Sequence, residues 1–421
     1  MNHKMNADDM NKKKTGVHYG IMANPGHNRV YFESSKMMAL GELEIASRCF
    51  QAKCTDYLSI QVEGIFLHTF IAEAPLEDED LRLLSRLSFV YAIFILMPLS
   101  EITKVSLQYK GKDTDFEQMK KYGFHSDIVM IPVQQIKSGV LGDDISTILK
   151  YSGKTNELFT RMMMNIGLMS GDFVHDKKLS VLDPLSGKGT TLFEAALSGW
   201  DASGVELVDK SVQEASAFFK KYLETGKYKH HSSKERLSGK NGVFKSEITR
   251  FEYSVSKEAQ KAGEKQTLTL VEGDSRFANE YFKKEQFHMI VADLPYGVQH
   301  GSKVGAAVND SRSSKKMKSG SNGNLLNVQN RAGSGFSSMT RNPKDLVKSC
   351  LPAWVEVLKP GGTIVLAWNR YVLKREELAE IFHIKGLAVL EESPYLGFEH
   401  QVDQSISRDM IVIKKVSSTP S

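Results

Sequence analysis

The side chains with the clearest capacity for chemistry lie within residues 291–297, which read VADLPYG. The apolar lead-in over residues 288–291 is typical of a buried strand, and the acid, proline, aromatic residue and glycine after it are typical of a tight loop. An open α/β sheet binds its ligand at the carboxyl ends of its strands. An acid beside a stiff turn and a flat ring can hold a planar group that carries an NH₂. We therefore expect Asp293 to be the centre of the functional site.

A second loop of this kind follows the strand predicted over residues 179–182. It spans residues 183–191 (DPLSGKGTT) and leads directly into an amphipathic helix. The loop lacks the full dinucleotide fingerprint, and it is not a Walker loop because Lys188 lies between the two glycines. The next predicted strand ends in Glu206, about 20 residues further on, which is where such folds bind a ribose hydroxyl.

Four successive predicted strands end in or just before a carboxylate: Asp183, Glu206, Asp274 and Asp293. Each acid taken singly is explained by helix capping, but four in register favour a shared nucleoside pocket, because strand ends converge in a doubly wound sheet. Strands predicted over 386–390 and 409–414 would close the sheet as an antiparallel edge. The predicted class is thus α/β, with a Rossmann-like doubly wound sheet.

The chain of 421 residues has room for two or three domains. We expect a frayed tail over residues 1–16, and an N-terminal α/β or α+β domain over 17–135 that either positions the substrate or only packs on the rest. In that domain, residues 20–23, 29–33, 58–62 and 65–71 read as strands, and residues 36–50 and 77–87 as helices. The main domain is predicted over residues 150–415 and begins with a methionine-rich helix, which is typical of core.

Two polar, basic stretches are predicted to interrupt the main sheet, at residues 226–266 and 298–342. The net charge of the whole chain is +5, while residues 300–342 hold seven Lys and Arg side chains against the single acid Asp310. The net positive charge of the second stretch is therefore larger than that of the whole chain. It is either a mobile flap that binds a nucleic-acid strand or a disordered loop.

Other features exclude some classes of protein. The longest apolar run, residues 87–99, is shorter than the roughly 20 residues that span a bilayer, and no secretory signal follows Lys12–Lys14. Three cysteines, Cys49, Cys54 and Cys350, give neither a disulfide framework nor a zinc spacing. We expect a cytoplasmic protein with reduced thiols, no membrane segment and no metal.

The motifs described above resemble one family. The loop 183–191, Glu206, Asp274, the DLPYG loop and the turn 359–362 (KPGG) are similar to those of class I S-adenosylmethionine-dependent methyltransferases that modify exocyclic amines. The DLPYG form, together with the start of a helix at 153–157 (GKTNE), most resembles the THUMP-associated tRNA guanine-N2 methyltransferases. Residues 18–132 do not carry the THUMP signature.

The resemblance implies that S-adenosylmethionine is the cofactor and that nucleic acid, tRNA in particular, is the substrate. The loop at Asp183, Gly187 and Gly189 would hold the methionine end of the cofactor, Glu206 its ribose and Asp274 its adenine amine. The implied cofactor residues are Asp183, Ser186, Gly187, Gly189, Thr190, Glu206 and Asp274, and the implied catalytic residues are Asp293, Leu294, Pro295 and Tyr296.

The chemistry expected of the DLPYG loop follows from the weakness of an exocyclic amine as a nucleophile. Asp293 and the carbonyl of Leu294 or Pro295 would accept its two N–H bonds and aim its lone pair, with Tyr296 stacked on the base. Such a base must be single-stranded, looped or flipped. A DNA adenine-N6 or cytosine-N4 methyltransferase and a non-catalytic subunit that binds the cofactor and RNA remain as alternatives. The roles of His400 and Arg408 stay open.

Overall fold

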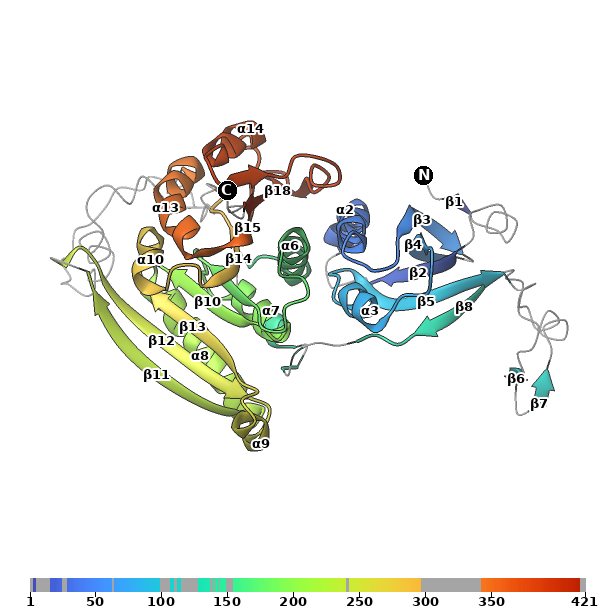
Figure 1. The fold of residues 1–421 in the computed structure, drawn as a ribbon, viewed down its shortest axis with the longest axis horizontal. Helices are drawn as coiled ribbons and strands as arrows, with labels where there is room; N and C mark the ends of the chain where they lie inside the picture. The colour runs from blue at the N-terminus through green and yellow to red at the C-terminus, as the bar shows by residue number, and fades with distance from the viewer. Residues whose placement is uncertain are drawn as a thin grey trace, which may run out of the picture.

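The computed structural model contains two domains that lie side by side along its longest axis (Figure 1). The smaller is formed by the N-terminal part of the chain, and the larger begins near residue 154. The structure describes residues 3–4, 16–24, 29–62, 64–98, 107–109, 112–114, 128–136, 139, 141–142, 144–148, 154–239, 242–296 and 342–416.

The N-terminal domain is a six-stranded sheet covered by two helices. Its central part follows the order β-α-β-β-α-β, and neighbouring strands there are antiparallel, as in the ferredoxin-like split βαβ unit. In spatial order the strands are β1 (His3–Lys4), β3 (Cys54–Val62), β4 (Ile65–Ala72), β2 (Val17–Ala23), β5 (Val90–Pro98) and β8 (Ile128–Val133). The helices are α2 (Arg29–Ser47) and α3 (Asp78–Ser85), and β6 (Leu107–Tyr109) and β7 (Lys112–Thr114) form a separate pair.

The strand predicted over residues 29–33 is wrong, because these residues begin helix α2. The stretch has high strand propensity, but local propensity yields to tertiary packing. The helix buries Leu43 and Ala46 against Phe70 of the sheet, in the same core cluster. The helix begins earlier than predicted, so Tyr31 lies in its first turns. The centroid of the Tyr31 ring is 6.1 Å from that of His400, at the boundary between the domains.

The larger domain is built on one mixed sheet with a parallel centre. Strands β13, β10, β9, β14 and β15 are neighbours and run parallel, and β18 runs antiparallel beside β15. In spatial order the strands are β11 (Lys229–Ser238), β12 (Lys245–Ser254), β13 (Gln266–Glu272), β10 (Asp201–Glu206), β9 (Ser180–Asp183), β14 (Phe287–Asp293), β15 (Leu358–Asn369), β18 (Ile406–Lys415) and β16 (Leu387–Val389), with β17 (His400–Asp403) paired to β18. The predicted doubly wound sheet with an antiparallel edge is therefore confirmed.

Helices pack on both faces of this sheet. Met289 and Val291 of β14 belong to one core cluster and Ile290 and Ala292 to the other, which explains why the strand reads as a continuous apolar run. The first face is covered by α6 (Glu157–Ser170), α7 (Thr190–Leu197) and α8 (Asp209–Thr225); the second by α10 (Ala278–Tyr281), α13 (Pro343–Val357), α14 (Arg375–Ala379) and η4 (Glu380–Phe382). Short elements complete the chain: α5 (Ile145–Ile148), α9 (Lys257–Lys261) and η3 (Ser275–Phe277).

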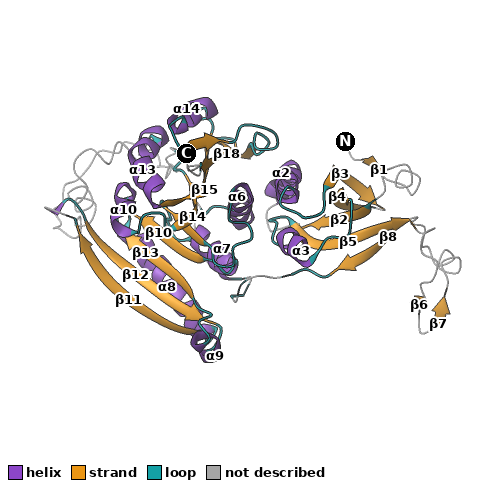
Figure 2. Ribbon diagram, viewed as in Figure 1, coloured by secondary structure: helices purple, strands orange, loops and turns teal. Residues whose placement is uncertain are grey.

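Residues 226–266 extend the sheet and do not interrupt it, which corrects the prediction. Strands β11 and β12 form a long hairpin, and β12 pairs with β13 (Figure 2). Strand β12 buries Ile248, Phe251 and Tyr253, while β11 is exposed along most of its length. A strand that lies at an edge and buries little has no hydrophobic pattern, so its polar sequence resembles that of a loop.

The two domains share part of one hydrophobic core. The cluster that contains Leu43 and Ala46 of α2 also contains Met162 and Ile166 of α6, so the methionine-rich helix is core, as predicted. At the centre of this contact the fully buried Glu42 accepts a hydrogen bond from Asn165 Nδ2 (2.8 Å). Among the described residues, no helix is long and apolar enough to cross a membrane.

Candidate active site

The four strand-end carboxylates lie along one edge of the sheet. Because β13, β10, β9 and β14 are successive neighbours and parallel, Asp274, Glu206, Asp183 and Asp293 follow one another in that spatial order. The predicted convergence of these strand ends is thus present in the structure. The roles assigned to the individual side chains remain predictions, and the geometry around each of them is described next.

The turn after β9 has the open shape that a bound ligand requires. Gly187 has φ +50°, and a Cβ added there would meet no atom within 4 Å, so its backbone borders empty space. Its N–H donates to Glu206 Oε2 (2.9 Å), which joins the turn to the end of β10. Gly189, with φ +91°, is the N-cap of α7, whose first residue is Thr190.

Ser186 also indicates that this turn binds a ligand. Its hydroxyl is buried and has no hydrogen-bond partner among the described residues. An unpartnered buried hydroxyl next to an open glycine backbone fits a ligand with polar atoms, such as the methionine end of S-adenosylmethionine. The residues present therefore fit the cofactor that the sequence implies.

Asp183 lies at the deepest point of the edge. It is 4% exposed, and its Oδ1 accepts a hydrogen bond from the N–H of Leu185 (3.0 Å). Burial raises the pKa of its carboxyl to about 7, since water no longer stabilises the charge. A cation bound beside it would favour the ionised form. Asp183 is therefore suited to the ammonium of an amino acid moiety.

Asp274 has a partner that the sequence did not reveal. Its carboxylate accepts hydrogen bonds from Arg276, with the shortest at 2.6 Å, and it also caps η3 through the N–H of Arg276. An adenine amine, if bound as predicted, would share this carboxylate with Arg276. Pairing with a guanidinium through several hydrogen bonds fixes the orientation of the carboxylate.

Asp293 is held by hydroxyl groups from two other elements. Thr155, just before the N-cap of α6, donates to Oδ2 (2.6 Å), and the hydroxyl of Tyr296 lies 2.6 Å from both oxygens. Burial and the Asp293 charge raise the pKa of Tyr296, so its hydroxyl remains a donor. The carboxylate accepts up to about four hydrogen bonds, so room remains for a substrate N–H.

Tyr296 already has partners within the protein for both its ring and its hydroxyl. The predicted role of its ring was to stack on the substrate base. The guanidinium of Arg408 lies 5.1 Å from its centroid, and its hydroxyl points at Asp293. The N–H of Leu294 is tied to β15 by a hydrogen bond to Ala367 O (2.8 Å), and Pro295 is exposed. Tyr296 thus orients Asp293, and stacking on a base stays a prediction.

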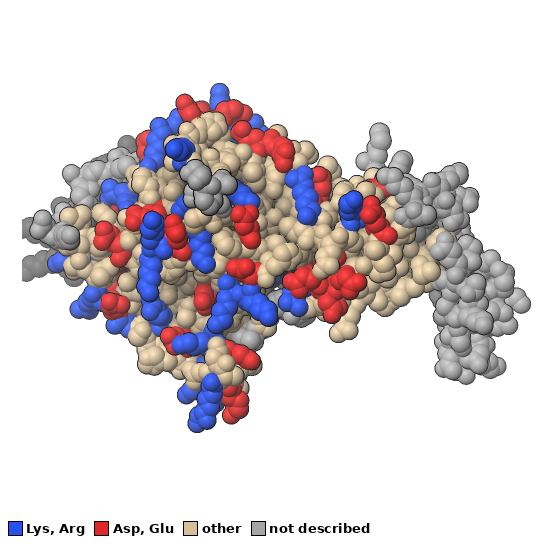
Figure 3. Space-filling model, viewed as in Figure 1, with Lys and Arg blue, Asp and Glu red and all other residues tan. Residues whose placement is uncertain are grey.

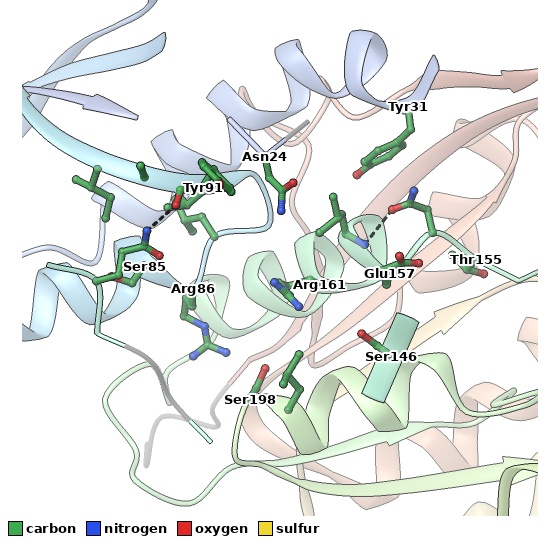
Figure 4. Close-up of a pocket in the computed structure, with 18 of the residues that line it drawn as sticks. Asn24, Tyr31, Ser85, Arg86, Tyr91, Ser146, Thr155, Glu157, Arg161 and Ser198 are labelled. Carbon is green, nitrogen blue, oxygen red and sulfur yellow. Dashed lines mark hydrogen bonds between the residues drawn. The ribbon is translucent and has the colours of Figure 1, made fainter. Parts of the chain in front are cut away.

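A cavity of about 900 Å³ opens between the two domains (Figure 4). Neither Asp293 nor the predicted cofactor residues line it. Thr155 and Arg408 line it, and both lie near Asp293: the Arg408 guanidinium is 3.9 Å from Oδ2. The N-terminal domain contributes Tyr31 and Arg86, and α6 contributes Arg161. The volume is in the range of ordinary small-ligand sites.

The lining of this cavity carries an excess of positive charge. Its charged side chains are Arg86, Lys154, Arg161 and Arg408 against Glu157. Burial lowers the pKa of Arg86 to about 9, which leaves it charged at neutral pH. Its guanidinium lies 4.3 Å from the Trp200 ring and donates to Asn165 from Nε (3.0 Å). Sequence reasoning missed this cavity because its walls come from both domains.

The basic stretches predicted to contact nucleic acid do not form a uniformly positive surface among the described residues. On the face shown in Figure 3, positive and negative side chains are interspersed over the larger domain. In the β11–β12 hairpin Lys234 pairs with Glu247 (2.5 Å), and Lys265 pairs with Glu252 (3.0 Å). Residues 298–341, which hold the most basic predicted segment, and Gly297 lie outside the described residues.

Comparison with known proteins gives a family for part of the chain. Residues 174–309 match the family model described as RMKL-like, methyltransferase domain. No curated protein matches the chain. Similar solved structures include TrmN from Thermus thermophilus, with 12% identity and a TM-score of 0.37, which covers 95% of this chain and 100% of its own.

Two further similar solved structures cover a smaller share of this chain. An rRNA methylase from Streptococcus thermophilus has 9% identity and a TM-score of 0.29, covering 63% of this chain and 100% of its own. A Streptococcus mutans protein in complex with SAH has 10% identity and a TM-score of 0.28, covering 57% and 90%. The strand order, together with the similarity of residues 174–309 to this family model, shows a Rossmann-like methyltransferase fold in the larger domain, with S-adenosylmethionine as the cofactor.

Proposed function

We propose that this protein transfers a methyl group to the exocyclic amine of a nucleic-acid base, and that the base is guanine N2 in tRNA. The observation that carries the proposal is the position of Asp293. Its carboxylate ends β14, in line with the acids predicted to hold the cofactor, and it adjoins a cavity with positively charged walls. A site with these neighbours suits a substrate that carries both an amine and phosphates.

The residues around Asp293 account for how an unreactive amine is activated. S-adenosylmethionine supplies a methyl group attached to a positively charged sulfur. Asp293 accepts an N–H of the amine, stabilises the positive charge that develops on nitrogen and is placed to take the proton that nitrogen loses. Thr155 and Tyr296 hold the carboxylate in one orientation through hydrogen bonds of 2.6 Å. Fixed acceptors need no reorganisation during the reaction.

The choice of RNA rests on the sequence resemblance and on the cavity. The DLPYG loop resembles that of tRNA guanine-N2 methyltransferases, and the cavity is large enough for a flipped nucleotide. A DNA adenine-N6 or cytosine-N4 methyltransferase would use the same acid and turn. A non-catalytic subunit would not need the intact arrangement of Asp293, Thr155 and Tyr296.

The experiment that tests the proposal identifies the methylated nucleoside. The full chain is incubated with methyl-labelled S-adenosylmethionine and, separately, with unmodified tRNA transcripts, ribosomal RNA and genomic DNA; each nucleic acid is then digested to nucleosides. We expect label in N2-methylguanosine from tRNA. Label in a methylated deoxynucleoside would replace the RNA assignment with the DNA alternative, and no label in any of the three would refute the proposal.

A further inference from the structure

The cavity between the domains contains two buried polar side chains whose nitrogen atoms have no assigned role. His400 of β17 and Arg408 of β18 are 6% and 5% exposed, and both line the cavity. His400 Nε2 and Arg408 Nε have no hydrogen-bond partner among the residues that the structure describes. Buried polar atoms are almost always hydrogen-bonded, so two such atoms, in side chains that line one cavity, point to a ligand that completes them.

The two side chains form one unit beside Asp293. His400 and Arg408 are directly opposite each other in the β17–β18 ladder. The ring of Phe159 contacts both, with its centroid 4.9 Å from the His400 ring and 4.8 Å from the Arg408 guanidinium. Arg408 lies 3.9 Å from Asp293 Oδ2, so a ligand that meets the pair lies close to the catalytic carboxylate.

The hydrogen-bonding character of each nitrogen atom is fixed by its surroundings. His400 Nδ1 lies 3.1 Å from the carbonyl oxygen of Phe398, so Nδ1 carries the proton and donates it to that oxygen. Burial lowers the pKa of His400 to about 4, so the ring is neutral at pH 7 and Nε2 is an acceptor. Arg408 Nε is always protonated and is therefore a donor.

A base that satisfies this site must present an amine to Asp293, an acceptor to Arg408 and a second donor to His400. Three common bases carry an exocyclic amine, but only guanine has a further N–H on its ring, at N1, next to the amine-bearing carbon. The other ring positions of adenine and cytosine offer only acceptors. Either of those bases would place an acceptor against His400 Nε2 and leave it unpaired.

We propose that the cavity receives the target base and that His400 selects guanine there by accepting a hydrogen bond from N1–H, while Arg408 donates to an acceptor of the same base. This inference rests on the proposed function, because it takes Asp293 as the acceptor for the amine. It assigns His400 as a specificity residue and gives a role to a buried histidine that lines the cavity and has an unpaired nitrogen.

The test compares guanosine with 2-aminopurine riboside, which keeps the 2-amine and changes the edge beside it, and with adenosine and cytidine, which carry their amine at another position. RNA hairpins are made with guanosine, adenosine, cytidine or 2-aminopurine riboside at one unpaired loop position. 2-Aminopurine carries the same 2-amine as guanine but lacks N1–H and O6. We expect wild-type kcat/KM for guanosine to exceed that for 2-aminopurine by about 10- to 100-fold, since a lost hydrogen bond in a polar site is costly.

Variants of the pair show whether His400 causes the preference. His400→Leu removes the acceptor, and we expect its guanosine to 2-aminopurine ratio to fall several-fold below that of the wild type; the remaining preference reports the loss of O6. His400→Gln, whose amide oxygen is also an acceptor, should restore most of the ratio. His383→Leu, at an exposed histidine that does not line the cavity, is the matched control and should keep the wild-type ratio.

The ratio is measured within one protein preparation, so partial loss of folding cancels from it. A wild-type ratio near one, or an unchanged ratio in His400→Leu, would overturn the guanine-selecting role while leaving methyl transfer itself supported. Methylation of adenosine or cytidine as fast as guanosine would do the same. If no hairpin and no natural nucleic acid is methylated, the proposed function fails and the inference fails with it.

Discussion

At the scale of single residues, the site depends on carboxylates with different environments. Asp183 is buried and has one backbone donor, Asp274 is paired with Arg276, and Asp293 is held by two hydroxyls. Burial without a cation raises the pKa of Asp183 to about 7. Environment, and not residue type, therefore separates the acid suited to a cationic ligand from those suited to neutral N–H donors.

The raised pKa of Asp183 predicts a pH dependence of stability. An acid whose folded pKa lies above its unfolded value binds its proton more tightly in the folded state, so stability falls as pH rises from about 4 to about 7. The full change is on the order of 4 kcal/mol. We expect Asp183→Asn to lose this dependence, and denaturant unfolding of both proteins at pH 5 and pH 8 measures it. Equal pH dependence in the two proteins would contradict the account.

The sequence was enough to predict that the acids of the two loops lie at the ends of strands. It was not enough to predict which residues contact them. The acids and glycines are recognisable because they follow apolar runs that predict strands. Thr155 lies 138 residues before Asp293, and Arg408 comes from the last strand, so no local pattern connects them to it. The sequence predicted a stacking role for Tyr296, but it did not predict that the hydroxyl of Tyr296 donates a hydrogen bond to Asp293.

At the scale of elements, helix α6 links the functional loop to the fold. Asn156 is its N-cap and accepts from the N–H of Leu158 (2.9 Å) and Phe159, which fixes the start of the helix. The residue before the cap, Thr155, is thereby held against Asp293 at the end of β14. The start of α6 is thus part of the active site, although the rest of the helix is core.

Removing the hydroxyl of Thr155 should slow methyl transfer without affecting the cofactor. A hydrogen bond to a charged group contributes about 1.5–3 kcal/mol, so Thr155→Val should lower kcat by roughly 10- to 100-fold. Single-turnover methyl transfer and calorimetric binding of S-adenosylmethionine measure the two effects. Thr155→Ser, which keeps the hydroxyl, is the control and should be near wild type. If Thr155→Val keeps the wild-type rate, Thr155 does not position Asp293.

The central strands and the antiparallel edge at β18 and β16 were predictable from the sequence, whereas the edge formed by β11 was not. Strand β14 is buried on both faces, and residues 289–292 form the continuous apolar run that such burial favours. Strand β11 is held by backbone hydrogen bonds to β12 and buries few side chains. Its sequence therefore shows no hydrophobic pattern that would predict a strand. Pairing of this kind is invisible to a pattern of hydrophobicity.

At the scale of the whole molecule, the binding cavity exists only because two domains meet. Helix α2 packs on α6, and the buried Glu42 joins them through Asn165 and the N–H of Ser88 (3.0 Å). Arg86 and Tyr31 then face the same cavity as Arg161 and Arg408. The N-terminal domain therefore forms one wall of this cavity.

If the cavity binds a phosphate-bearing strand, Arg86 should contribute to RNA affinity. We expect Arg86→Gln to weaken binding of tRNA and to reduce the slope of log K against log salt concentration by about one at most, with cofactor binding unchanged. Arg82→Gln is the matched control: Arg82 lies on α3 of the same domain but faces Glu79 (3.7 Å) and does not line the cavity. The same loss of slope in both variants would indicate general charge and not the cavity.

The central claim is that Asp293 acts on the substrate amine and not on the cofactor. The most direct test measures Asp293→Ala in two assays: single-turnover methyl transfer to tRNA and equilibrium binding of S-adenosylmethionine. We predict that the variant loses detectable methyl transfer and binds the cofactor within a few-fold of wild type, because the cofactor residues lie on the neighbouring strands. Methyl transfer that survives in Asp293→Ala would contradict the account.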